Sequence, residues 1–148
     1  MKNLILSTAL FLGLAISSMA PALAHEAAKA GPTGGRVLHK GEPHAEFFVN
    51  ADKKVEIRFL DDKNKVIAPA DQKVTVIVGE RSNPTTLSFT KDGDKLISDK
   101  ALPAGEVMPA VVQIKPTADG KAVTEKFNLN LAKCPTCKLQ EYACECAH

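Results

Sequence analysis

The chain has no tryptophan, a single tyrosine and only 5% aromatic residues in total. Proteins that bind single-stranded nucleic acid stack the bases on aromatic side chains along a basic groove. A strong net charge is also missing, because 19 basic residues stand against 17 acidic residues and leave a net charge of +2 at pH 7. A balance this close disfavours a polyanionic partner. We therefore predict that the chain binds no nucleic acid.

The chain also lacks an apolar run of the roughly 20 residues that a membrane-spanning helix needs. Its hydrophobic run near the start, Leu4–Ile16, has 13 residues. Lys2 precedes this run, and a stretch of small residues that ends in Ala-Leu-Ala at positions 22–24 follows it. This order is typical of a cleavable secretory signal peptide. Residues 1–24 are therefore predicted to be a signal peptide, which places the mature chain in the periplasm or outside the cell without stable membrane insertion.

Motifs of common enzyme sites are missing as well. The sequence contains neither the G-x-S-x-G elbow of the serine hydrolases nor the glycine pattern of a phosphate-binding P-loop. We therefore predict that the protein is not an enzyme.

A sustained helical periodicity is absent, whereas alternation with a period of two is frequent. Val55, Ile57 and Phe59 alternate with charged residues, which places apolar side chains on one face of a strand. Pairs such as Asp92-Gly93 between these segments favour hairpin turns. Strands are predicted at residues 36–39, 44–50, 54–60, 73–79, 85–90, 94–98, 107–115 and 121–131.

Short strands at this spacing predict an all-β fold, an antiparallel immunoglobulin-like β-sandwich over residues 36–131. Residues 25–35 are rich in glycine and alanine without a period, and we predict a flexible arm there. Residues 132–148 form a cysteine- and histidine-rich tail.

Cysteine is absent from the first 133 residues, and all four cysteines lie in the tail. Cys134, Cys137, Cys144 and Cys146, followed by His148, form the pattern C-x2-C-x6-C-x-C-x-H. A C-x2-C turn directs two sulfurs at one ion, and a second close pair completes a tetrahedron. Thiolates favour soft ions. The tail therefore predicts a transition-metal site for Cu(I) or Zn(II), with His148 as a further candidate ligand.

Two other interpretations of the same cysteines stay open. An exported protein commonly holds its cysteines in disulfides, and four cysteines allow three pairings. Cys134 and Cys137 also match a C-x-x-C redox motif, although that motif is typical of a βαβ context.

The remaining histidines lie near the start of the mature chain. Cleavage after residue 24 makes His25 the first residue, so that its α-amine and its ring can chelate one metal ion. His39 and His44 bracket a turn, and we predict that they converge across it, with Glu42 or Glu46 as oxygen ligands. The alternative is that each histidine is an ordinary surface residue.

The stretch G-P-T-G-G-R-V-L at residues 31–38, followed by P-H-A-E-F-F-V at residues 43–49, resembles a segment near the start of some periplasmic adaptor (membrane-fusion) subunits of heavy-metal efflux pumps of the RND class. It also resembles small exported proteins found alongside such pumps. The resemblance covers about 20 residues well and the following sheet more loosely. It implies periplasmic handling of a transition metal, with efflux pump components as partners. The long helical hairpin and the lipoyl-like domain of a full adaptor have no counterpart here.

Two functions therefore compete. The first is an exported transition-metal-binding protein, which serves as a carrier, buffer or accessory factor in heavy-metal handling or efflux. The second is a structural or interaction domain of the cell envelope, with its tail locked by disulfides.

Overall fold

The computed structural model describes residues 29–146, so the predicted signal peptide, His25 and His148 lie outside the described residues. Within this part of the chain, no helix is long and apolar enough to cross a membrane. The strands and the single short 3-10 helix of the described residues are β1 (Arg36–Leu38), β2 (His44–Val49), β3 (Lys54–Leu60), β4 (Val66–Ile67), β5 (Lys73–Val78), β6 (Thr85–Asp92), β7 (Lys95–Ala101), β8 (Val107–Lys115), β9 (Val123–Asn130) and η1 (Glu141–Ala143).

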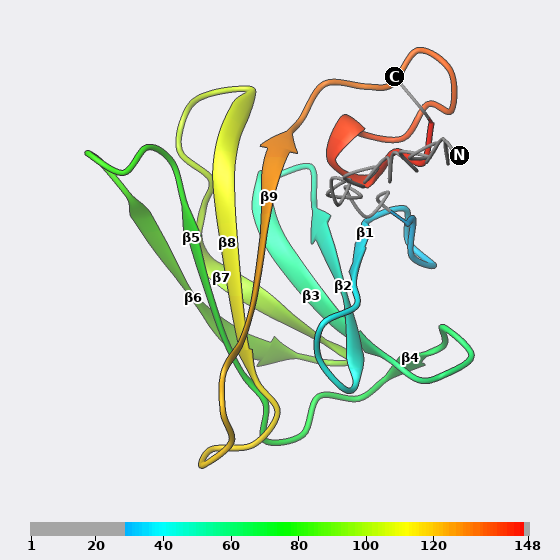
Figure 1. Cartoon of the computed structure of the whole chain (residues 1–148), viewed down its shortest axis with the longest axis vertical. Helices are drawn as coiled ribbons and strands as arrows, with labels where there is room; N and C mark the ends of the chain where they lie inside the picture. Colours follow the sequence, from blue (N-terminus) through cyan, green and yellow to red (C-terminus); the bar gives the residue numbers. More distant parts are fainter. Residues whose placement is uncertain (1–28, 147–148) are drawn as a thin grey trace, which may run out of the picture.

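The strands form one antiparallel sheet with the order β1-β2-β3-β7-β6-β5-β8-β9, and β4 pairs with β3 off this path. The prediction of an all-β antiparallel fold is confirmed, but the two-sheet immunoglobulin-like sandwich is wrong. The reason lies in β6, which pairs with β5 over residues 85–88 and with β7 over residues 89–92. This strand therefore connects the two groups of strands that a sandwich would hold in separate sheets. The single sheet curls into a nearly closed barrel (Figure 1).

Side chains close the remaining gap between β1–β2 and β9. The Phe47 ring of β2 meets the Phe127 ring of β9 edge-to-face, with 5.2 Å between the ring centroids. The guanidinium of Arg36 in β1 lies 4.8 Å from the centroid of the same Phe127 ring. Aromatic pairs and cation–π contacts of this kind each contribute about 0.5–1.5 kcal/mol. The two edges of the sheet are therefore held together by packing between side chains.

The predicted alternation matches the packing of the central strands. Val55, Ile57 and Phe59 of β3 are fully buried in the core, together with Leu87 of β6 and Leu129 of β9. Burying side chains of this size stabilises the fold by about 1.5–3 kcal/mol each. The alternating residues that predicted the strands are therefore the residues that build the core.

A compact polar network covers the other face of β3. Glu56 is nearly buried, and its carboxylate lies 2.6 Å from Arg58 Nη2 and 3.0 Å from Lys95 Nζ. It also accepts a hydrogen bond from Asn50 Nδ2 at 3.1 Å. Burial raises the pKa of Glu56, but the hydrogen bonds from Lys95, Asn50 and Arg58 outweigh this effect and hold the pKa below its ordinary value of 4.5. The charged carboxylate is therefore favoured by folding.

The lowered pKa of Glu56 predicts that the folded protein loses stability in acid. Because its pKa is lower in the folded state, its stabilising effect is present above pH 4.5 and is lost as the pH falls through the folded-state value. Glu56→Gln should lower the free energy of unfolding by about 1.5–3 kcal/mol at pH 7 and flatten its dependence on pH below 4.5. Urea unfolding at several pH values measures both effects.

Glu80→Gln is the matched control, because Glu80 lies exposed at a turn after β5. It should leave the stability at pH 7 within about 0.5 kcal/mol of the unchanged protein. Equal acid sensitivity in the Glu56 variant and the unchanged chain would contradict the role assigned to Glu56.

Candidate metal centre

The first cysteine pair lies in a tight hairpin that follows β9. The Cys134 N–H donates to the Leu139 carbonyl at 2.7 Å, and the Lys138 N–H donates to the Cys134 carbonyl at 3.1 Å. Lys138 adopts a left-handed backbone conformation with φ of 63°, which reverses the chain directly after Cys137. The turn therefore brings Cys134 and Cys137 to one side of the hairpin.

The second pair returns to the same place through η1. The Ala143 N–H donates to the Gln140 carbonyl at 2.9 Å, and the Cys144 N–H donates to the Glu141 carbonyl at 3.3 Å. Cys144 itself has extended backbone angles, φ −73° and ψ 132°. The Cys146 N–H then donates a hydrogen bond to the Cys144 sulfur at 3.3 Å.

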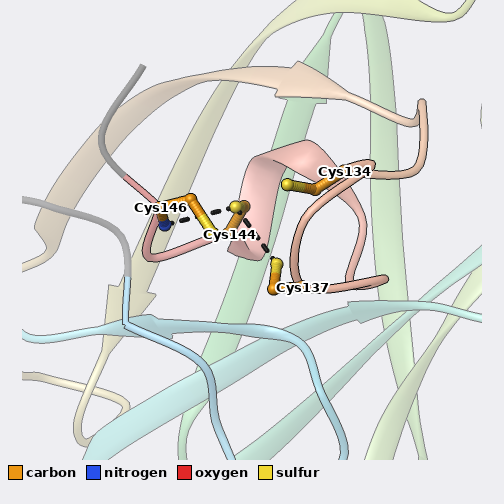
Figure 2. Close-up of side chains that lie close together, drawn as sticks. All are labelled: Cys134, Cys137, Cys144 and Cys146. Atoms are coloured by element: carbon orange, nitrogen blue, oxygen red, sulfur yellow. Dashed lines mark hydrogen bonds between the residues drawn. The ribbon is translucent and has the colours of Figure 1, made fainter.

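The four cysteines form one cluster, with all four Sγ atoms within 4.8 Å of one another (Figure 2). The Cys137 and Cys144 sulfurs lie 3.2 Å apart. A tetrahedral zinc site with Zn–S bonds of about 2.3 Å has sulfurs about 3.8 Å apart. The cluster therefore fits one tetrahedral ion with adjustments of about 1 Å or less. All four cysteines are thiols in this structure.

Backbone hydrogen bonds prepare one of these sulfurs for a negative charge. The Cys137 N–H points at the Cys134 sulfur and, together with the Cys144 thiol and the Thr136 N–H, holds the pKa of Cys134 well below its usual value of 9.0. Burial has the opposite effect on Cys144 and raises its pKa, as do its hydrogen bonds to Cys134 and Cys137. Metal binding to such a cluster displaces the protons that the sulfurs share.

Tyr142 anchors the cluster to the sheet. Its side chain is 2% exposed, and its ring meets the Phe47 ring edge-to-face at 5.8 Å. The Tyr142 hydroxyl accepts a hydrogen bond from the Val49 N–H at 3.0 Å, and its carbonyl accepts one from Arg36 Nη1 at 3.4 Å. Residues 132–146, the described part of the tail, are therefore packed against the domain.

Residues 29–35, the described part of the predicted arm, form a hydrogen-bonded loop beside the tail. The Ala30 N–H donates to Glu145 Oε1 at 2.8 Å. The carboxylate of Glu46 lies beneath the loop and accepts hydrogen bonds from the Thr33 and Gly35 N–H groups at 2.9 and 2.8 Å. This loop, which carries the glycine-rich motif, therefore contacts both β2 and the cysteine tail.

Two glycines of this loop have no room for a side chain. A Cβ atom at Gly31 would lie 2.5 Å from Cδ of Glu46, and a Cβ atom at Gly35 would collide with the carbonyl oxygen of Phe47. The glycines of the motif are thus explained by the close approach of the loop to β2.

Gly35→Ala should therefore lower the free energy of unfolding by about 1–3 kcal/mol, the usual effect of overpacking. Gly41→Ala is the matched control, because the nearest atom to a Cβ there is Val123 Cβ at an ordinary 3.8 Å. Urea unfolding of both variants makes the comparison, and equal stabilities would contradict the steric argument.

The histidines do not join the cysteine cluster in the described part of the chain. His39 and His44 converge across their turn as predicted, with ring centroids 5.3 Å apart in an edge-to-face arrangement. His44 Nε2 lies 3.2 Å from Glu42 Oε1. However, His44 is the first residue of β2, whereas Val49, the last residue of that strand, contacts Tyr142 of the tail. The cysteines and these histidines therefore lie at opposite ends of β2.

The two glutamates that sequence analysis paired with the histidines have different roles. Glu42 reaches His44. Glu46 is fully buried and binds the loop at residues 33–35 instead. His25 and His148 lie outside the described residues, so their predicted part in metal binding stays a prediction.

No family model, curated protein sequence or solved structure matches the chain. The cluster of sulfurs itself is therefore the main guide to function.

The residues that hold the cluster in place were not predicted from the sequence. Tyr142, Arg36 and Glu145 contact segments more than 90 residues away in the sequence. One signal was available for Tyr142: it is the sole tyrosine of the chain and stands between the two cysteine pairs. A large side chain in a short polar tail is typical of an anchor to a core.

Proposed function

We propose that this protein is an exported transition-metal-binding protein, a carrier, buffer or accessory factor in heavy-metal handling or efflux. One observation carries the proposal, the convergence of four cysteine sulfurs within 4.8 Å of one another. The signal-peptide pattern supports export to the periplasm or beyond. The resemblance of the glycine-rich segment to heavy-metal efflux adaptors supports pump components as partners.

A tetrahedral set of four thiolates favours Zn(II), and Cu(I) is the second candidate because it also prefers soft sulfur ligands. Magnesium and calcium are disfavoured, because both prefer oxygen ligands. We propose no catalytic role, because four thiolates would fill the tetrahedral positions of the ion and leave none for a substrate.

Metal titration followed by native mass spectrometry tests the proposal. The purified protein, reduced and freed of metal, should bind one zinc ion per chain, and Cu(I) added in competition should report the preference between the two ions. Binding of iron alone would overturn the choice of metal, since a four-sulfur site also suits that element.

The competing function is a structural or interaction domain with a disulfide-bonded tail. Thiol counting on protein purified from its native compartment distinguishes the two functions. Metal binding predicts four thiols that become reactive once a chelator removes the metal. Four cysteines that stay unreactive until a reductant is added, with no bound metal, would favour the structural domain.

A further inference from the structure

The four sulfurs of the cluster are not equally accessible. Cys134 is 1% exposed and Cys144 is 7% exposed, whereas Cys137 and Cys146 are half-buried. Figure 2 shows the two half-buried residues on separate stretches of chain, one in the hairpin and one after η1. A ligand from solution therefore meets the cluster first on the side of Cys137 and Cys146.

The two buried cysteines, Cys134 and Cys144, are also the two whose backbone is held by main-chain hydrogen bonds. Cys134 is held by two main-chain hydrogen bonds across the hairpin, and this hairpin also contains Cys137. Cys144 directly follows Tyr142 and Ala143, which are buried, and its N–H donates to the Glu141 carbonyl.

Both half-buried cysteines donate a backbone N–H to a sulfur of the cluster, Cys137 to Cys134 and Cys146 to Cys144. Cys137 lies inside the hairpin that the main-chain bonds of Cys134 close, whereas no such bond between described residues encloses Cys146, which is therefore the less firmly anchored of the two. It follows Glu145, whose exposed side chain accepts the Ala30 N–H at 2.8 Å, so the contact that holds this stretch is made by a neighbouring side chain and not by Cys146 itself. Its backbone hydrogen bond among the described residues goes to the Cys144 sulfur, inside the cluster itself, at 3.3 Å. A ligand held in this way is displaced with less rearrangement of the fold than Cys134 or Cys144.

We infer that Cys146 is the ligand through which the metal ion leaves and enters, and that the acceptor is a partner that presents a thiol. This inference rests on the proposed function. In the exchange step, the acceptor sulfur bonds to the ion and the bond between the ion and Cys146 breaks. The proton of the acceptor thiol passes to the Cys146 sulfur. No electron is transferred, so the step needs no oxidant or reductant.

A thiol acceptor fits this site better than an acceptor with oxygen ligands. The ion bound by four thiolates is soft, and carboxylates compete weakly for such an ion. A single incoming sulfur also replaces Cys146 without opening the hairpin of Cys134 and Cys137, so three of the original sulfurs stay bound during exchange.

The test uses the protein loaded with Cd²⁺, whose bonds to sulfur absorb in the ultraviolet. Loss of this absorbance is followed after mixing with increasing dithiothreitol, which serves as the thiol acceptor. A separate series uses EDTA, which serves as the acceptor with carboxylate ligands. The rate should rise in proportion to the dithiothreitol concentration. Cys146→Ser should still bind Cd²⁺ but release it to dithiothreitol about tenfold faster, a change that corresponds to about 1.4 kcal/mol.

A second measurement needs no variant. The Cd²⁺-loaded protein is treated with a small amount of N-ethylmaleimide and digested, and the alkylated cysteines are located by mass spectrometry. Cys146 should be alkylated first, and Cys134 and Cys144 last. Alkylation of Cys137, Cys134 or Cys144 before Cys146 would overturn the inference, as would a release rate independent of dithiothreitol. Failure of the reduced protein to bind Cd²⁺ at all would overturn the proposed function as well.

Discussion

Replacing both Cys134 and Cys137 with serine is expected to abolish tight zinc binding while the sheet stays folded. The two sulfurs supply half of the cluster, and a hydroxyl is a far weaker ligand for a soft ion than a thiolate. The affinity should fall by more than about 100-fold, because changes that merely disturb the surroundings of a metal ligand already reach that size. Competition with a chromogenic chelator measures the affinity.

Thr136→Ser is the matched control, because Thr136 is an exposed residue of the same hairpin and contributes its backbone N–H to the cluster. It should bind zinc like the unchanged protein. The sheet should stay folded in the double variant, because the strands and their core lie largely before residue 132. Unfolding of the sheet in the double variant under reducing, metal-free conditions would contradict this separation of roles.

Tyr142→Ala is expected to have the largest effect on stability. The side chain is 2% exposed, packs against Phe47 and accepts a hydrogen bond from the Val49 N–H. Truncation of a buried aromatic residue to alanine costs about 3–5 kcal/mol. Because Tyr142 joins the tail to the sheet, the same variant should also bind zinc more weakly. Urea unfolding with and without zinc measures both effects.

Tyr142→Phe is the conservative comparison for this experiment. It keeps the ring against Phe47 and removes the hydroxyl that accepts from the Val49 N–H. The loss should then be about 1–3 kcal/mol, the usual effect of leaving a buried donor without its partner. An alanine variant within about 0.5 kcal/mol of the unchanged protein would show that the tail does not depend on this anchor.

The positions of the strands were largely predictable from the sequence. Alternating residues such as those of β3 are buried on one side of a curved sheet just as they are in a sandwich, so the period of two predicts the strand. The two-residue strand β4, Val66–Ile67, was missed because two residues are too few to show a period.

The architecture was not predictable from the same pattern. Both a sandwich and a barrel bury one face of each strand, so alternation does not distinguish them. The difference depends on β6, whose two halves pair with different neighbours. No local signal in the sequence marks where one partner gives way to the next.

The cysteine cluster was predictable, but its surroundings were not. The close spacing of Cys144 and Cys146 already placed two sulfurs within reach of the first pair. The contacts of Tyr142 with Phe47 and Val49 join distant parts of the chain and leave no mark in the local sequence. The position of His44 at the far end of β2 from the cysteines likewise depends on strand register.

X-ray absorption at the zinc edge of the zinc-loaded protein tests the central claim most directly. Four sulfur atoms at about 2.3 Å around a single zinc ion are expected, supplied by Cys134, Cys137, Cys144 and Cys146. A shell with fewer than four sulfurs, completed by nitrogen or oxygen atoms, would contradict the account.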